Sequence, residues 1–137
     1  MQVSEVLLGG VLVALGATVG TPARFFVSGV IARRFGETFP WGTLVVNVSG
    51  CLIMGAVAAF AKAHHLSFES PAWLLAATGF LGSYTTVSSF ALQTRALVRE
   101  GEHRSAIGYI LLSVVLCLAA VGAGFAAGPL AFAGSGR

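Results

Sequence analysis

The chain alternates four long uncharged stretches with short charged segments. The uncharged stretches are residues 6–23, 38–61, 70–94 and 105–136, and each reaches the roughly 17 to 20 residues that cross a bilayer as a helix. We therefore expect four transmembrane helices at about residues 5–35, 41–61, 71–99 and 105–128, within a single membrane domain over residues 1–137. The pattern predicts an all-α membrane protein.

The third stretch has a polar centre that an ordinary lipid-facing helix would not need. Residues 78–90 contain two glycines and a run of hydroxyl side chains. Glycine costs about 1 kcal/mol relative to alanine inside a helix, and serine competes for backbone hydrogen bonds. We therefore expect the third helix to break near Gly82. Backbone freed at membrane depth is tolerated where protein buries it or where it lines a wet cavity, which indicates an ion or solute site.

Composition agrees with a membrane location. Hydrophobic residues make up 56% of the chain and charged residues only 9%, and the mean hydropathy is +0.88, which is far from the values of soluble domains. The first stretch is not expected to be a cleaved signal peptide, because no basic segment precedes it. The net charge of +3 comes almost wholly from arginines between the stretches. Loops of membrane proteins have this bias, so no nucleic-acid partner is expected.

Three polar or aromatic positions are candidates for function. Arg24 follows a Thr-Pro pair near the membrane interface, where a snorkelling anchor and a buried structural or anion-attracting cation are equally compatible with it. Asn47 lies within the second stretch, where an amide either bonds a neighbouring helix or offers its protons to a solute. Taken alone, the packing role is the commoner one. Phe90 follows the run of hydroxyls, which places an aromatic edge beside polar groups.

The fourth stretch carries Tyr109, Ser113 and Cys117 at intervals of four, which forms a polar stripe along one helical face. None of the uncharged stretches contains Asp or Glu, and all three histidines lie outside them. The hydroxyls therefore have no general base, and no carboxylate is available for proton-coupled transport. We expect no enzyme activity. A passive pathway lined by hydrogen-bond donors remains, which favours anions, and the small, strongly hydrated fluoride ion fits it.

Three segments together resemble one known family. They are Gly16-Ala17 with Arg24, the segment 42–47 (Gly-Thr-Leu-Val-Val-Asn) and the segment 79–90 (Gly-Phe-Leu-Gly-Ser-Tyr-Thr-Thr-Val-Ser-Ser-Phe). In this order and spacing they resemble the bacterial fluoride channel family, Fluc or CrcB, over essentially the whole chain. The resemblance implies a multi-pass protein of the cell (inner) membrane that lets fluoride leave the cell passively and so reduces fluoride toxicity. It also implies an antiparallel, dual-topology homodimer with two fluoride pathways.

The resemblance assigns roles to particular residues. The backbone carbonyls of Gly82 and Thr85 would hold a structural sodium ion at the dimer axis, and carbonyls exposed at a helix interruption suit a hard cation. Asn47 would donate to fluoride, and the positive ring edge of Phe90 would face the anion. The other members of the pathway would be hydroxyl groups, those of Thr86, Ser88, Ser89, Tyr109 and Ser113.

Two positions depart from the family pattern. Val87 stands where the first of two pore phenylalanines is expected, and Gln93 stands where an acid is expected. One ring per pathway would then remain, so either throughput is low or the chain pairs with a second, homologous subunit. The homodimer is our first expectation.

The loop cations are unevenly divided between the two sides of the membrane. With helices crossing alternately, one side holds six and the other two, namely Arg24, Arg33, Arg34, Arg95, Arg99 and Arg104 against Lys62 and Arg137. Such a bias favours one fixed orientation, and therefore favours pairing with a different subunit. Two alternatives to a self-sufficient fluoride channel stay open: a small proton-coupled exporter of cationic solutes, and a non-conducting subunit of a hetero-oligomeric channel.

Overall fold

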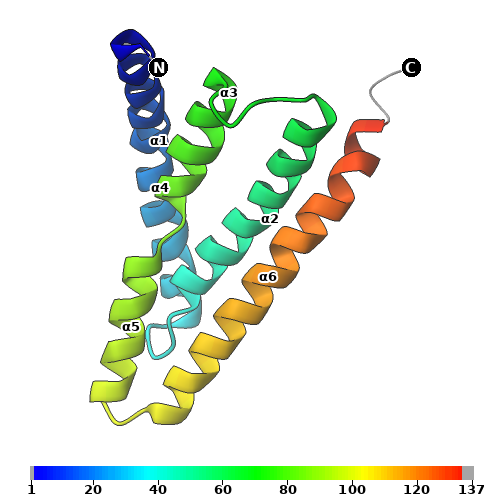
Figure 1. Ribbon diagram of the computed structural model, residues 1–137. Coiled ribbons are helices and arrows are strands. Elements are labelled where there is room, and N and C mark those ends of the chain that lie inside the picture. Colours follow the sequence, from blue (N-terminus) through cyan, green and yellow to red (C-terminus); the bar gives the residue numbers. More distant parts are fainter. Residues whose placement is uncertain (1, 134–137) are drawn as a thin grey trace.

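Four helical crossings run alternately in opposite directions through the protein (Figure 1). The computed structural model describes residues 2–133, with side chains up to residue 128. The first, second and last crossings are single helices, whereas the third is built from four consecutive pieces. In chain order the elements are α1 (Val3–Phe35), α2 (Trp41–Ala63), α3 (Pro71–Trp73), η1 (Leu74–Leu81), α4 (Gly82–Tyr84), α5 (Val87–Arg99) and α6 (His103–Ala133).

The helices confirm the predicted all-α membrane protein. In the described part of the chain α1, α2 and residues 103–128 of α6 are long and apolar enough to cross a membrane, and the broken third crossing accompanies them. The predicted ends differ slightly, because α1 begins at Val3, α2 continues to Ala63 and α6 begins at His103. Arg137, one of the cations counted above, lies outside the described residues.

The third crossing breaks at Thr85 and Thr86, nearly one turn beyond the predicted position. Both residues are extended, with φ −79° and ψ 162° at Thr85 and φ −153° and ψ 124° at Thr86. Gly82 is helical, with φ −63° and ψ −32°. The predicted break is therefore confirmed, and its position is corrected from Gly82 to the two threonines.

Hydroxyl groups on both sides of the break bond to the neighbouring backbone. The Ser83 hydroxyl donates to two carbonyls of the preceding turn, at 2.7 Å and 3.0 Å, and Thr85 Oγ1 donates to Leu81 O at 2.9 Å. Bonds of this kind keep the hydroxyls satisfied inside the helix, and they often bend it. Thr86 Oγ1 then accepts from Ser89 N at 3.2 Å as the N-cap of α5. The capping threonine decides where the helix restarts.

Glycines bring α1 against the third crossing directly before the break. A Cβ at Gly16 would lie 2.7 Å from Phe80 N and 2.9 Å from Gly79 C, and a Cβ at Gly20 would overlap Phe80 O. This small-residue face of α1 is therefore a packing surface. Because only hydrogen fits at these positions, α1 fixes the backbone of η1 and α4.

The contact of α2 with α6 is the most extensive between the described elements. The two helices lie side by side and run in the same direction (Figure 1). A Cβ at Gly55 would overlap Val121 O, one at Gly124 would overlap Leu52 O, and one at Gly128 would overlap a side chain of α2. This close packing sets a short, fixed separation between the two helices.

Candidate functional site

Asn47 of α2 pairs with the backbone of the break. Its Nδ2 donates to Thr86 O at 2.8 Å, and its Oδ1 accepts from Thr86 N at 2.8 Å. The amide thus replaces the backbone partners that Thr86 loses where the helix is interrupted. The packing role considered for Asn47 is therefore real. The side chain carries a second N–H on Nδ2, and its donation to an anion stays a prediction.

The same hydrogen bonds free the two carbonyls that the family resemblance assigns to sodium. In a continuous helix Gly82 O would accept from Thr86 N, and Thr85 O would accept from Ser89 N. Instead, Thr86 N donates to Asn47 Oδ1 at 2.8 Å and Ser89 N donates to Thr86 Oγ1 at 3.2 Å. Both carbonyls therefore lack their helical donors. Two such oxygens fit a hard cation, for which unwound backbone at membrane depth is a common ligand.

Three of the predicted pathway hydroxyls lie together where α5 begins. Thr86 Oγ1 lies 3.2 Å from Ser88 Oγ and donates to Ser89 Oγ at 3.1 Å. Thr86 is buried, Ser89 is half-buried and Ser88 is exposed. The three groups therefore form a hydrogen-bonded chain from the break to the surface of α5.

Tyr109 of α6 and Phe90 of α5 also meet. Their ring centroids lie 5.2 Å apart, and the ring of Phe39 approaches Tyr109 edge-on at 5.5 Å. Tyr109 is fully buried, and its hydroxyl donates to Gln93 Oε1 at 3.2 Å. Gln93, which departs from the family pattern, therefore holds the phenol in place.

Ser113 is the least satisfied polar group near these residues. Its Oγ is buried and has no hydrogen-bond partner among the residues that the structure describes. An unsatisfied buried hydroxyl costs about 1 to 3 kcal/mol. It would therefore be unfavourable for the Ser113 hydroxyl to lack a hydrogen-bond partner at all times. The Ser113 hydroxyl is therefore available to a water molecule or an ion.

Polar side chains face one another along α2 and α6. Thr43 of α2 interacts electrostatically with Tyr109 of α6, and Cys51 of α2 with Cys117 of α6. Because residues four apart share a helical face, Asn47 and Ser113 occupy the level between these two pairs. The resulting polar seam consists of Thr43, Asn47 and Cys51 on α2 with Tyr109, Ser113 and Cys117 on α6. On both helices the seam residues are spaced four apart in the sequence. The sequence-based prediction included this spacing only for the residues of α6.

Arg24 lines a cavity of about 250 Å³ together with members of the hydroxyl cluster. Thr86 and Ser89 contribute their hydroxyls, and no salt bridge to Arg24 is present in the described chain. The other lining residues are Thr21, Phe25, Ser28, Thr43 and Val46. A cation beside several hydroxyls, without a paired carboxylate, makes this cavity suited to an anion.

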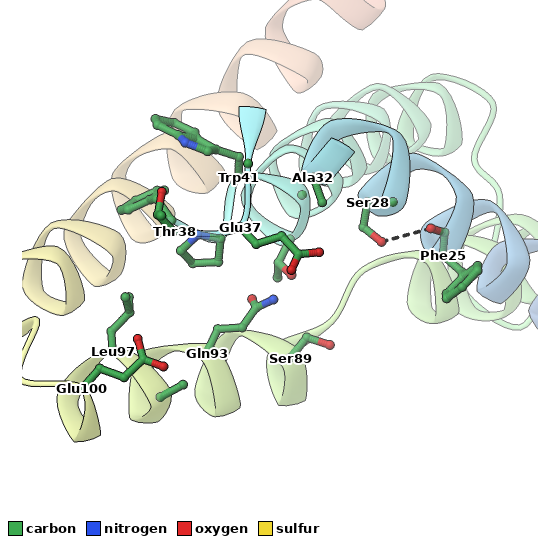
Figure 2. Close-up of a pocket in the computed structure, with 17 residues that line it drawn as sticks. Phe25, Ser28, Ala32, Glu37, Thr38, Trp41, Ser89, Gln93, Leu97 and Glu100 are labelled. Carbon is green, nitrogen blue, oxygen red and sulfur yellow. Dashed lines mark hydrogen bonds between the residues drawn. The ribbon is translucent and has the colours of Figure 1, made fainter. Parts of the chain in front are cut away.

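A larger cavity of about 540 Å³ adjoins the first and shares Phe25, Ser28, Thr43 and Ser89 with it. Figure 2 shows the side chains of Glu37, Gln93 and Glu100 directed toward this space. Both glutamates are exposed and lie in the loop after α1 and at the end of α5. The larger cavity therefore has a polar rim at the end of the bundle. This rim was not predicted from the sequence, because the sequence of a loop does not show which carboxylates come together in space.

Val87 does not lie among these residues. It is 79% exposed at the start of α5. Gly82 is also exposed, on the turn before the break. This surface of the third crossing is open on the single chain.

Comparisons with known proteins identify the family that the chain resembles. The family model described as "CrcB-like protein, Camphor Resistance (CrcB)" matches residues 11–125. The "Fluoride-specific ion channel FluC 2" of Rhodopseudomonas palustris (strain BisB18) is 57% identical over 124 residues, which cover 90% of this chain and 95% of the relative. The protein of the same name from Bradyrhizobium diazoefficiens is 53% identical over 124 residues, 89% of this chain and 90% of the relative. The "Fluoride-specific ion channel FluC" of Paracoccus denitrificans is 49% identical over 121 residues, 88% of this chain and 94% of the relative.

The apolar helices and these relatives bear out two further expectations. The chain is a multi-pass membrane protein, and its family consists of ion channels rather than enzymes. Since the family model covers most of the chain and relatives match at about half of all positions or more, the chain belongs to the CrcB-like family of fluoride channel proteins.

Proposed function

We propose that the protein forms a fluoride-selective channel through which fluoride leaves the cell passively, which lowers its toxicity in the cytoplasm. The observation that carries this proposal is the hydroxyl cluster at the break, which shares a cavity with Arg24 and is clamped by Asn47. Its groups are donors or a cation, and donors replace the water that a strongly hydrated anion must give up. The names of the relatives support fluoride as that anion.

The proposed route runs from the larger cavity past Arg24 and the hydroxyl cluster to the polar seam. Glu37 and Glu100 lie at the exposed rim of the larger cavity, where water and salt screen their charges. In the protein interior, the buried hydroxyl of Ser113 has no hydrogen-bond partner among the described residues, and the ring of Phe90 lies beside Tyr109. An anion entering this route therefore exchanges bulk water for fixed donors.

A growth experiment tests the proposed function. In a bacterial strain deleted for its own fluoride export genes, expression of this chain should restore growth in fluoride, while growth in equal chloride stays unchanged. Restoration requires that the chain alone conducts. Absence of rescue, with the chain present in the membrane, would contradict the self-sufficient channel.

We infer that the functional unit is an antiparallel dimer joined through the exposed face of the third crossing. Gly82 and Val87 are both exposed on this face, and four crossings are few to enclose a pore. A second candidate, in which this chain is one subunit of a hetero-oligomer, is favoured by Val87 at the position of a pore phenylalanine and by the uneven loop cations. Co-expression of this chain with a differently tagged two-phenylalanine relative distinguishes them, because only a hetero-oligomer would be purified with both tags.

We also propose that the carbonyls of Gly82 and Thr85 contribute to a structural sodium site between the subunits. The loss of their helical donors supports this assignment. Replacing sodium by N-methylglucamine during purification is expected to lower the thermal midpoint of the detergent-solubilised dimer and to slow fluoride efflux. A melting curve that is the same in both cations would contradict the site independently of transport.

A further inference from the structure

Tyr84 joins the chain before the break to α2, as Asn47 joins the chain after it. The Tyr84 side chain is buried, and its hydroxyl lies 3.0 Å from Ser49 Oγ. Ser49 Oγ donates its one proton to Val46 O at 3.1 Å, so the phenol is the donor in the bond to Ser49. Two nearby positions of one helix therefore hold the chain on either side of Thr85.

Thr85 packs directly on the backbone of α2 between these two hydrogen-bonded residues. A Cβ at Gly50 would overlap the Thr85 methyl group and would lie 3.3 Å from Cδ1 of Tyr84. Thr85 Oγ1 donates to Leu81 O at 2.9 Å, within its own crossing. Because only hydrogen fits at Gly50, the break cannot come closer to α2. The hydrogen bond to Ser49 keeps it from moving away.

The same contacts orient the carbonyl that we assign to sodium. Thr85 O and Thr86 N belong to one planar trans peptide unit, in which C=O and N–H point in opposite directions. Thr86 N donates to Asn47 Oδ1 at 2.8 Å, so Thr85 O points away from that asparagine. Tyr84 lies between Gly82 and Thr85 in the chain. Its contact with α2 therefore fixes the backbone that separates the two carbonyls.

The Tyr84 ring is also held from the side of α1. It stacks on the ring of Phe80, with centroids 5.9 Å apart and an interplanar angle of 7°. The backbone of Phe80 lies against Gly16 and Gly20, where only hydrogen fits. Packing and a hydrogen bond together thus lock the Tyr84 rotamer, and locked supporting side chains are what a preorganised site requires.

We propose that Tyr84 is a positioning residue for the structural sodium site. Its hydroxyl donates to Ser49 and does not bind the ion, and the side chain acts by holding the carbonyls of Gly82 and Thr85 at the spacing that the ion requires. This inference rests on the sodium site proposed above and adds the side chain that supports it. Loss of the hydroxyl should therefore weaken sodium binding without removing a ligand.

The sodium dependence of the thermal midpoint tests this role. Detergent-solubilised dimers are melted in chloride salts without fluoride, with N-methylglucamine replacing sodium at constant ionic strength. An ion that binds the folded state makes the midpoint depend on its concentration, which gives an apparent dissociation constant. Tyr84→Phe keeps the ring and removes the hydroxyl. It should raise this constant about fivefold, which corresponds to about 1 kcal/mol, the usual contribution of one hydrogen bond.

Further variants separate positioning from packing. Ser49→Ala breaks the same hydrogen bond and should raise the constant equally, and it keeps the test open if Tyr84→Phe does not assemble. The double variant should add nothing further, because both changes remove one interaction. Thr18→Val is the matched control. It removes a hydroxyl that donates to Leu15 O at 2.6 Å on an exposed part of α1 and should leave the constant unchanged.

The possible failures are distinguishable. A Tyr84→Phe midpoint that is lower by the same amount at every sodium concentration would make Tyr84 a packing residue and overturn the proposal. An equal rise of the constant in Thr18→Val would overturn it as well. A midpoint of the unaltered chain that does not respond to sodium would contradict the sodium site itself, and the role of Tyr84 with it. Since no fluoride is present, the result does not depend on conduction.

Discussion

Replacement of Asn47 by alanine is expected to lower fluoride efflux by at least about tenfold. The substitution removes both partners of the Thr86 backbone, which are the Nδ2 donor and the Oδ1 acceptor, each at 2.8 Å. A buried group left without a partner costs about 1 to 3 kcal/mol, and 1.4 kcal/mol corresponds to a factor of ten. The break, the freed carbonyls and the hydroxyl cluster would all lose their common support. Fluoride efflux from liposomes with matched protein content measures the effect.

Two further variants separate the contributions of Asn47. Asn47→Asp keeps the acceptor for Thr86 N but loses the donor and adds a negative charge, so it should conduct as poorly as the alanine variant. Val45→Ala changes a half-exposed residue on the opposite side of the same helical turn and should leave efflux unchanged. Normal fluoride efflux through an Asn47→Ala dimer would show that the two hydrogen bonds between Asn47 and the Thr86 backbone are not needed for conduction.

Replacement of Ser113 by alanine is expected to slow fluoride efflux several-fold without loss of stability. The Ser113 Oγ has no partner among the described residues, so its removal relieves an unsatisfied buried hydroxyl worth about 1 to 3 kcal/mol. A thermal midpoint that is equal or higher, combined with slower efflux, is the signature of a group kept for transport. Thermal denaturation in detergent and efflux from liposomes measure the two properties on the same preparation.

Ser49 provides the contrasting control. Its hydroxyl lies 3.1 Å from Val46 O and 3.0 Å from the Tyr84 hydroxyl, so Ser49→Ala removes satisfied hydrogen bonds. We expect this variant to be less stable by about 1 kcal/mol. If Ser113→Ala destabilised the protein as Ser49→Ala does and left efflux intact, Ser113 would be a packing residue only.

The sequence was sufficient to predict the crossings and the existence of the break. Charge-free windows locate membrane helices because an unpaired charge is costly in hydrocarbon, and α1, α2 and α6 follow them closely. The polar centre of the third window predicted an interruption. Its position depended on which hydroxyl caps the following helix, and glycine propensity carries no information about that choice. The break therefore lies at Thr85 and Thr86 rather than at Gly82.

The partners of the site residues could not be predicted in the same way. Asn47 was expected to need a partner, but its bond to a backbone 39 positions away depends on tertiary packing. The unpartnered state of Ser113 likewise follows from the register of α2 against α6. Only the interval of four on each helix was visible beforehand. Local pattern thus predicted the candidates, and the packing of the helices decided which of them meet.

The measurement that tests the central claim most directly is anion efflux from liposomes that hold the purified protein. Fluoride and chloride are compared at the same sodium concentration, with empty liposomes as the reference. The account predicts rapid loss of fluoride and no loss of chloride above the reference. Equal loss of both ions, or retention of both by liposomes with verified dimers, would contradict a selective fluoride channel formed by this chain alone.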